Sequence, residues 1–330
     1  MNIVVDAMGG DYAPKVVIEG AKEAVRKFGV EITLVGKEEA ILKEFRGGVP
    51  RGIKIHPAEE VIEMDEAPAA SVRKKRNSSI VVGLDLVKEK KADAFFSAGN
   101  TGAVVCAGTL GLRLLPGIER PGIGLVVPTL AEPALLIDVG ANIDPKPLHL
   151  LQYGIMADAY VRDVFDRRDV KVGLLNIGEE ETKGTDFVKE TYQLLEKSKL
   201  TFVGNVEAKD VFTGKCDVIV CDGFVGNVAL KITEGVAEVV AEFLRRELTR
   251  NFLTKVGIFF IKNSLRRFKK RLDYSEYGGA PLLGVDGTVI IGHGRSSAYA
   301  IMNAIRVAKE EVERRVNEKI VEAVASSNMG

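Results

Sequence analysis

Five asparagines lie in short glycine-containing loops, each at or near the end of an apolar run. They are Asn100, Asn142, Asn176, Asn205 and Asn227. An uncharged amide donates hydrogen bonds, and glycine lets the backbone come close to an anion. Because strand ends in an open α/β sheet border one crevice, these loops predict a site that holds a small oxyanion such as phosphate.

The loop after the apolar run Ala94–Ser97 has the richest anion-binding pattern. Polar side chains and glycines stand here at the start of an apolar helical segment, which is typical of a phosphate cradle; the same residues would also serve as an ordinary N-cap. The expected phosphate contacts are Ser97, Gly99, Asn100, Thr101 and Gly102. Replacing Asn100 by Ala is expected to lower activity with little change in melting temperature.

A glycine turn follows the first strand, in Asp6-Ala7-Met8-Gly9-Gly10-Asp11. Gly9 and Gly10 permit a tight turn and are expected to approach phosphate through their backbone. The segment lacks the GxGxxG spacing of a dinucleotide site. Taken alone, it is equally typical of a plain structural turn.

A third loop, Asp222-Gly223-Phe224-Val225-Gly226-Asn227, also joins a strand to a helix. Gly226 and Asn227 are expected to contact phosphate, with Asn227 also facing a developing oxyanion. Asp222 would orient a donor or accept a proton, and Asp138 at another strand end has the same two options. Strand-end aspartates also cap loops, so the residue type leaves both options open.

Two further side chains are candidates for the site. Lys183 lies in an acidic loop, where its ammonium would either neutralise phosphate or remain solvated. His293 precedes the last long helical segment, in Gly292-His293-Gly294-Arg295-Ser296-Ser297. It would bind an anion or phosphopantetheine, or simply lie beside a helix cap.

The length of 330 residues is enough for one large α/β domain or for two smaller units that share a sheet, and a single α/β domain over 1–330 is expected. Hydrophobic residues make up 46% and mean hydropathy is +0.08, which is ample for a core. Lys+Arg and Asp+Glu both number 46. This balance argues against a nucleic-acid-binding protein, since such proteins usually carry a basic excess.

Three cysteines, Cys106, Cys216 and Cys221, show no CxxC pair, so neither a disulfide framework nor a metal site is expected. No cofactor is expected either. The start Met1–Asp6 resembles a strand rather than a signal peptide, and no apolar run reaches the length of a spanning helix. A cytoplasmic location is therefore expected.

Strand-like and helical runs alternate over most of the chain, which predicts an open, mostly parallel, Rossmann-like sheet with helices on both faces. The expected strands are Ile3–Asp6, Ile32–Val35, Ile53–His56, Ala94–Ser97, Ile123–Val127, Ala134–Asp138, Val172–Asn176, Thr201–Gly204, Val218–Asp222 and Val289–Ile291. The expected helices include Lys15–Phe28, Ser71–Lys91, Leu148–Phe165, Asp186–Lys197, Asn227–Leu248 and Ser296–Ala325.

Residues 250–285 interrupt the alternation and are expected to form an inserted helical hook. Apolar residues occur in two opposite phases at 100° per residue, so two short amphipathic helices with a break near 257–262 are expected. The second is basic, which suggests a membrane surface, an acidic partner, or a dimer interface with a solvated face. The expected contact residues are Leu253, Val256, Phe259, Phe260, Ile261, Leu265, Arg266, Arg267, Lys269 and Lys270.

Taken together, these motifs resemble the phosphate acyltransferase family, also called acyl-acyl carrier protein:phosphate acyltransferases. The resemblance runs from residue 2 to about residue 310, and it is carried by the segments Asp6–Asp11, Ser97–Ala103, Asp138–Asn142, Gly204–Glu207, Asp222–Val228, Tyr277–Ala280 and His293-Gly294. The first of these segments is the most specific motif, and the order of the others strengthens it.

The resemblance implies transfer of a long-chain fatty acyl group from acyl carrier protein to inorganic phosphate. The acyl phosphate would supply phospholipid synthesis, where a glycerol-3-phosphate acyltransferase is a possible partner. The family fold resembles that of phosphotransacetylase and isopropylmalate dehydrogenase. Members form homodimers and associate peripherally with membrane, which the 250–285 hook would serve. Because acyl carrier protein is acidic, Arg266, Arg267, Lys269 and Lys270 would alternatively dock this protein.

The chemistry that the resemblance implies needs no covalent intermediate, because a thioester is already activated. Phosphate must be aligned with the carbonyl, and the oxyanion must be stabilised. We assign Asn100 and Thr101 to phosphate, Asn227 to phosphate or the oxyanion, and Asp222 to orientation. Lys183 would compensate charge and His293 would line the thioester end. Two alternatives remain: another enzyme on this sheet, such as a short-chain phosphotransacetylase or a decarboxylating dehydrogenase, and a non-catalytic membrane scaffold.

Overall fold

A single sheet of eleven strands runs through the computed structural model, which describes residues 1–330 except 252–253, 255–256, 258–259, 266, 268–273 and 328–330. The strand order is β3-β2-β1-β4-β11-β10-β5-β6-β9-β7-β8. The strands are β1 (Asn2–Asp6), β2 (Glu31–Gly36), β3 (Ile53–Pro57), β4 (Ala94–Ser97), β5 (Gly122–Val127), β6 (Ala134–Ile137), β7 (Lys171–Leu175), β8 (Thr201–Val206), β9 (Val218–Val220), β10 (Ala280–Leu283) and β11 (Thr288–Ile291).

Two parallel blocks make up most of this sheet, which confirms the predicted fold class. The first block is β3-β2-β1-β4-β11 and the second is β6-β9-β7-β8. Between them β10 is antiparallel to both β11 and β5, and β5 is antiparallel to β6. The sheet therefore takes in Ala280–Leu283, a stretch that the sequence places inside the 250–285 hook.

Helices cover both faces of each block. They are α1 (Lys15–Phe28), α2 (Glu38–Lys43), α3 (Pro68–Lys74), α4 (Ser79–Lys88), α5 (Thr101–Gly111), α6 (Pro147–Val164), α7 (Asp186–Lys197), α8 (Gly223–Thr249), α10 (Ala298–Arg314) and α11 (Val316–Ser326), with short 3₁₀ turns at Ala208–Phe212 and Tyr274–Glu276. Alternate β1 residues enter different cores: Ile3 and Val5 pack with α1 and α10, whereas Val4 packs with α4 and α5. A strand buried on both faces is typical of a parallel sheet.

Two segments predicted as single helices are each divided in two. The helix expected over 71–91 is interrupted after α3, because Ser78 starts α4 as an N-cap that accepts a hydrogen bond from the Val81 N–H. The helix expected over 296–325 ends at Arg315, whose φ of 54° belongs to the left-handed region. In the 296–325 segment the apolar periodicity continues across the break and conceals the boundary, whereas the first break lies in the polar run 73–79.

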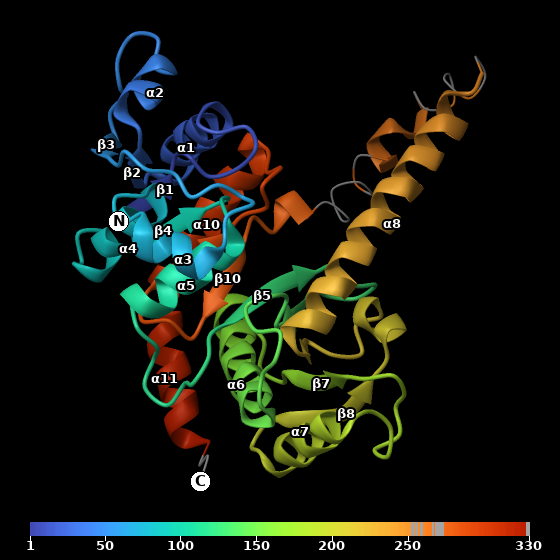
Figure 1. Ribbon diagram of the computed structural model, residues 1–330. Coiled ribbons are helices and arrows are strands. Elements are labelled where there is room, and N and C mark those ends of the chain that lie inside the picture. Colours follow the sequence, from blue (N-terminus) through green and yellow to red (C-terminus); the bar gives the residue numbers. More distant parts are fainter. Residues whose placement is uncertain (252–253, 255–256, 258–259, 266, 268–273, 328–330) are drawn as a thin grey trace.

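The long helix α8 starts at the end of β9 and extends away from the body of the molecule (Figure 1). Only Gly223 and Gly226 of its residues are buried. In the part of the chain that the structure describes, no helix is long and apolar enough to cross a membrane.

Candidate functional site

The loops that follow β1, β4 and β11 meet at the carboxyl end of the first block. A Cβ on Gly9 would lie 2.7 Å from the Gly99 nitrogen and 2.6 Å from Asp6 Oδ2, so only glycine fits between these loops. The Asp11 N–H donates to the Gly294 carbonyl at 2.8 Å. Three separate loops are thus held together around main-chain groups.

A buried carboxylate fixes the first two of these loops. Ser97 Oγ donates to Asp6 Oδ2 at 2.7 Å and accepts from the Gly99 N–H at 3.0 Å. Burial raises the pKa of the Asp6 carboxyl, although hydrogen bonds from Ser79, Ser97 and main-chain groups oppose the shift. Ser97 is fully buried, so here it shapes the loop; its direct contact with phosphate stays a prediction.

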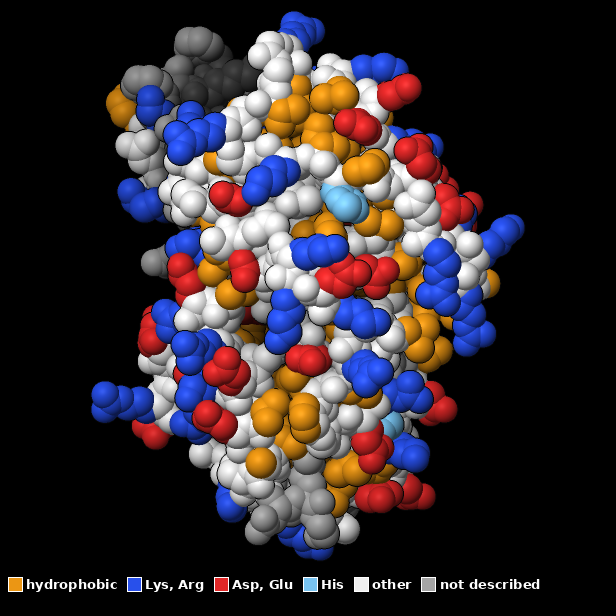
Figure 2. Space-filling model, turned by 90° about the vertical axis from the view of Figure 1, so that its left-hand side faces the viewer, with side chains coloured by type: hydrophobic (Ala, Val, Ile, Leu, Met, Phe, Trp, Pro, Cys, Tyr) orange, Lys and Arg blue, Asp and Glu red, His pale blue; other side chains and the backbone are white. Residues whose placement is uncertain are grey.

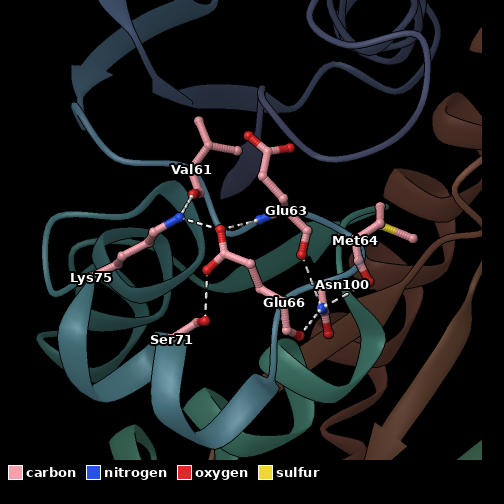
Figure 3. Close-up of polar contacts among 7 residues, drawn as sticks. All are labelled: Val61, Glu63, Met64, Glu66, Ser71, Lys75 and Asn100. Atoms are coloured by element: carbon pink, nitrogen blue, oxygen red, sulfur yellow. Dashed lines mark hydrogen bonds and ion pairs between the residues drawn. The ribbon is translucent and has the colours of Figure 1, made fainter.

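Asn100 caps α5 and also holds a loop of residues 61–66 against that helix. Its Oδ1 accepts from the Ala103 N–H at 3.0 Å, and its Nδ2 donates to the carbonyls of Glu63, Met64 and Glu66 at 3.0–3.2 Å (Figure 3). The side chain is 6% exposed. Both amide hydrogens are therefore already directed at carbonyls, which gives Asn100 a positioning role in this structure.

The 61–66 loop is itself fastened to α3 through Glu66. Its carboxylate accepts from Ser71 Oγ at 2.6 Å and pairs with Lys75, whose ammonium also donates to the Val61 carbonyl at 2.6 Å (Figure 3). The hydrogen bond from Lys75 is the main reason that the pKa of Glu66 falls to about 2. A continuous path of polar contacts thus joins α3 to the N-terminus of α5.

A second set of loops lies at the carboxyl ends of β6 and β9. The fully buried Asp138 carboxylate accepts four main-chain N–H groups, from Ile123, Gly140, Ala141 and Asn142, at 2.8–3.1 Å. Burial raises its pKa and these hydrogen bonds oppose the shift. Since three of these bonds fix the 138–142 loop and the fourth ties it to β5, Asp138 has a structural role whatever its part in chemistry.

The start of α8 packs directly onto that loop. Asp222 caps the helix by accepting from the Phe224 and Val225 N–H groups at 3.0 and 2.9 Å. A Cβ on Gly226 would overlap the Asp138 carbonyl oxygen at 1.9 Å. Asn227 is exposed and lies against Gly140, whose built Cβ would be 3.7 Å from Asn227 Nδ2. Its amide therefore stands at the surface of the second set of loops.

Helix α8 then connects the second set of loops to the first. Glu234 Oε1 lies 3.8 Å from His293 Nε2, and Glu238 Oε1 accepts from Arg295 Nη2 at 3.1 Å. Burial lowers the pKa of His293 more than Glu234 raises it. His293 Nδ1 accepts from the Arg295 N–H at 3.1 Å, which assigns the ring proton of the neutral form to Nε2.

Lys183 belongs to a separate group of contacts around the β7–α7 loop. Its carbonyl accepts from Asn176 Nδ2 at 3.2 Å, and Asn205 Nδ2 donates to the Glu180 carbonyl at 3.0 Å. The Lys183 side chain is exposed, and within the described residues no hydrogen bond or ion pair links it to the loops above. Its charge-compensating role stays a prediction.

Of the predicted contact residues in the hook, four are described. Phe260, Ile261 and Arg267 are exposed, and Leu265 is half-buried. The others, Leu253, Val256, Phe259, Arg266, Lys269 and Lys270, lie outside the described residues.

The site contains no prepared protein nucleophile among its described thiols. Burial raises the pKa of Cys221 well above the usual value and that of Cys216 to about 11. Cys221 Sγ donates to the Asp138 carbonyl at 3.3 Å. Thiols in such surroundings stay protonated at neutral pH. Within the described part of the chain, no group of three or more His, Cys, Asp or Glu side chains is placed to hold a metal ion.

Sequence reasoning missed the residues that hold the loops from a distance. Glu66, Lys75 and Met64 were not candidates, yet a Cβ on Gly294 would lie 3.3 Å from Met64 Cε. Glu234 and Glu238 were missed as well. None of them lies in a glycine motif, so no local signal marks them.

Two cavities of the structure lie away from these loops. One, of about 440 Å³, lies beside Arg46 and Arg51, and the other, of about 460 Å³, lies beside Gln152 and Val324.

Known proteins resemble this chain over nearly its whole length. A family model described as "Fatty acid synthesis protein" matches residues 1–319. The chain is 52% identical over 323 residues to a phosphate acyltransferase of Desulfitobacterium hafniense, covering 97% of this chain and 96% of that protein. It is 50% identical over 330 residues to a phosphate acyltransferase of Dictyoglomus thermophilum, covering 98% of each.

Solved structures show the same fold at low sequence identity. A phosphotransacetylase from Streptococcus pyogenes superposes with a TM-score of 0.61 at 19% identity, covering 94% of each chain. The EutD phosphotransacetylase from Staphylococcus aureus gives 0.59 at 16% identity, covering 99% of this chain and 94% of that one. At such identities the likeness speaks for the architecture alone.

Proposed function

The chain belongs to the fatty acid synthesis protein family and is an acyltransferase that uses phosphate as acceptor, and from this premise we propose that its donor is a long-chain acyl thioester of acyl carrier protein. The product is an acyl phosphate for phospholipid synthesis, where a glycerol-3-phosphate acyltransferase would consume it. The family resemblance supports this choice of donor. The reactivity of a thioester supports it as well, because a thioester needs no further activation.

The observation that carries the proposal is the convergence of helix N-termini and glycine loops. The starts of α5, α8 and α10 follow β4, β9 and β11, and each has a polar N-cap: Asn100, Asp222 and Ser297. Helix N-termini offer free N–H groups and a partial positive charge to an anion. Because α8 contacts the loop after β11 through Glu234 and Glu238, both blocks border one site.

The reaction proceeds by direct attack. A phosphate oxygen adds to the thioester carbonyl carbon, the carbonyl oxygen becomes an oxyanion, and collapse breaks the carbon–sulfur bond and releases the carrier's thiolate. The protein holds the two reactants in line and donates hydrogen bonds to the oxyanion. No covalent protein intermediate is needed, in accord with the buried, protonated thiols.

The residues divide into contact and positioning groups. Thr101 and Asn227 are exposed beside the helix starts and contact phosphate or the oxyanion. The backbones of Gly9, Gly10, Gly99, Gly102 and Gly226 line the approach. Asn100 and Asp222 act by fixing the helix starts. His293, with Nε2 protonated, lines the thioester end, and Lys183 compensates charge.

We further propose a homodimer formed through α8. At 100° per residue, Val225, Val228, Ile232, Val236, Val239 and Phe243 fall within an arc of about 80°. Their exposed fractions lie between 41% and 62%. An apolar stripe of this length on a projecting helix is unfavourable in water, and a second copy of the stripe is the partner that symmetric oligomers commonly supply.

Peripheral membrane contact is the proposed role of the segment after α8. Phe260 is 79% and Ile261 45% exposed, beside the exposed cation Arg267. Exposed apolar residues next to basic ones are typical of helices that lie in a membrane surface.

The decisive experiment measures phosphate-dependent loss of palmitoyl-acyl carrier protein, with hydroxylamine trapping of acyl phosphate. Saturable product formation in both substrates is expected. Turnover of palmitoyl-coenzyme A but not of the carrier-bound acyl group would replace the proposed donor. Absence of product from every donor, in spite of vesicle binding, would favour the scaffold alternative.

A further inference from the structure

Three cations at the end of α3 are directed to solvent. Arg73, Lys74 and Arg76 are exposed, and in the described structure no hydrogen bond or ion pair engages their side chains. Lys75 between them is different, because its ammonium turns inward to Glu66 and the Val61 carbonyl. The segment thus contains one structural lysine and three unpaired cations. We call Arg73, Lys74 and Arg76 the α3 basic cluster.

The α3 basic cluster lies close to the candidate site. Lys75 contacts Glu66, and the Glu66 carbonyl accepts from Asn100, the N-cap of α5 (Figure 3). At the other end of α3, a Cβ on Gly102 would lie 2.6 Å from Pro68 Cγ, so the first turns of α3 and α5 are in contact. The seven residues of α3 span roughly 10 Å, so the cluster lies about that far from the contact between α3 and α5.

Ordinary structural roles account for only part of this charge. Cations in the last turn of a helix complement its dipole. This role explains Arg73 and Lys74 but not Arg76, because Arg76 lies beyond the end of the helix. Two nearby acids are already engaged, since Glu60 accepts from the Asn77 N–H at 2.9 Å and Glu66 pairs with Lys75. Figure 2 draws the left-hand side of Figure 1, where acidic and basic side chains are interspersed.

We propose that the α3 basic cluster docks the acidic carrier protein so that its prosthetic arm enters the site beside Asn100 and Thr101. The inference rests on the proposed donor. It also assigns the basic residues of the chain to two different partners, because the α3 basic cluster meets protein whereas Arg266, Arg267, Lys269 and Lys270 are left for lipid. Charge complementarity of this kind mainly raises the association rate and depends on ionic strength.

The test compares three charge-reversed enzymes with wild type in acyl phosphate formation from palmitoyl-acyl carrier protein. The first carries Arg73→Glu, Lys74→Glu and Arg76→Glu. The matched control carries Lys43→Glu, Arg46→Glu and Arg51→Glu, three exposed cations at the α2–β3 corner. The third carries Arg266→Glu, Arg267→Glu, Lys269→Glu and Lys270→Glu. Melting temperatures of all variants are measured alongside.

We expect the α3 variant to raise KM for the carrier-bound donor at least tenfold, with kcat within twofold and an unchanged melting temperature. Its KM should also lose most of its dependence on salt. An unchanged KM, or an equal rise in the control or in the 266–270 variant, would overturn the docking surface. Failure of wild type itself to use the carrier, while it uses palmitoyl-coenzyme A, would instead overturn the donor.

Discussion

Asn100 shows how one buried amide both positions a loop beside the proposed site and stabilises a helix start. Sequence alone predicts that Asn100→Ala lowers activity and leaves the melting temperature nearly unchanged. The structure revises the second half of that prediction, because the side chain caps α5 and holds three carbonyls of the 61–66 loop. A lost N-cap costs about 1 kcal/mol, and stranded buried carbonyls add roughly 1–3 kcal/mol.

We therefore expect Asn100→Ala to lose both activity and several degrees of melting temperature. Thr101→Ala is the matched control, since Thr101 is exposed at the same helix start. It should lower kcat/KM for phosphate with an unchanged melting temperature. Steady-state kinetics and calorimetry on both variants decide the matter; a fully stable Asn100→Ala protein would contradict the positioning role.

Glu311 in α10 is a buried acid with a measurable effect on stability. It is 4% exposed, and its Oε1 has no hydrogen-bond partner among the residues that the structure describes. Burial raises its pKa well above the usual value in spite of a hydrogen bond from Tyr160. The fold therefore favours the protonated carboxyl. The unfolded chain ionises near 4.5, so this stability is complete below that pH and is lost as pH rises through the folded-state pKa.

Glu311→Gln should remove that dependence, because an amide keeps the shape and cannot ionise. We expect the free energy of unfolding of the variant, relative to wild type, to rise between pH 5 and pH 8 by about 1.4 kcal/mol per unit of pKa shift. Urea unfolding at both pH values measures it, with the exposed Glu190→Gln of α7 as control. If the difference in free energy of unfolding between the variant and wild type stayed constant with pH, Glu311 would be ionised in the fold.

Residue types predicted part of the site and missed its supports. The sequence identifies the glycine loops at Gly9, Gly99 and Gly226 because a close backbone approach needs glycine, and built Cβ atoms there lie within 3.4 Å of neighbouring loops. Glu66 and Lys75 were not, because their pairing depends on the path of the chain between α3 and α5. No spacing rule within one segment encodes that path.

At the scale of elements, α3 and the 61–66 loop form a small unit fastened by the Glu66–Lys75 pair. The depressed pKa of Glu66, about 2 against an ordinary 4.5, means that the ionised form supports the fold above pH 4.5. That support is lost as pH falls toward 2. The pair is partly exposed, so its effect should be local rather than global.

Lys75→Met should therefore loosen residues 58–78 without unfolding the sheet. We expect faster amide hydrogen exchange in that segment and a roughly 10- to 100-fold lower kcat/KM, the size of effect that a small misplacement of reacting groups produces. Glu66→Gln with Lys75→Met should be no worse than Lys75→Met alone, because the unpaired carboxylate is then gone. Additive losses would show that the two residues act separately.

Element prediction succeeded where periodicity is local and failed where pairing is remote. All ten expected strands occur, because their apolar runs are bounded by turn residues. The strand β10 was missed, since its four residues form a ladder only with β5 and β11. The short helix α2 was missed as well. The helix break at Arg315 is hidden by continuous apolar periodicity, whereas the break at Ser78 follows a polar run that is equally compatible with an exposed helical turn.

At the scale of the whole molecule, the two blocks meet through the twist of the sheet and through α8. Strand sense reverses at three successive pairings between β11 and β6, which alone would direct the two sets of carboxyl ends to opposite edges. A twist of about 20–25° per pairing adds up to roughly 60–75° over these three pairings, so α8 is needed to link the two sets of carboxyl ends. The twelve helical steps from Asp222 to Glu234 bridge them over roughly 18 Å, as the Glu234–His293 contact requires.

The same helix provides the last prediction, which concerns assembly. If α8 pairs with a second copy, Ile232→Asp with Val239→Asp should place charge in the centre of the apolar stripe and yield a monomer. Ala241→Asp is the control, because residue 241 is exposed and lies about 180° from the centre of the stripe at 100° per residue. Light scattering coupled to gel filtration measures the mass, and circular dichroism checks the fold.

Either a wild-type monomer or a doubly charged variant that stays dimeric would show that a second copy does not pair with the apolar stripe of α8. A folded monomer that keeps kcat but loses vesicle binding would mean that the paired helices serve the membrane and that each chain holds a complete site.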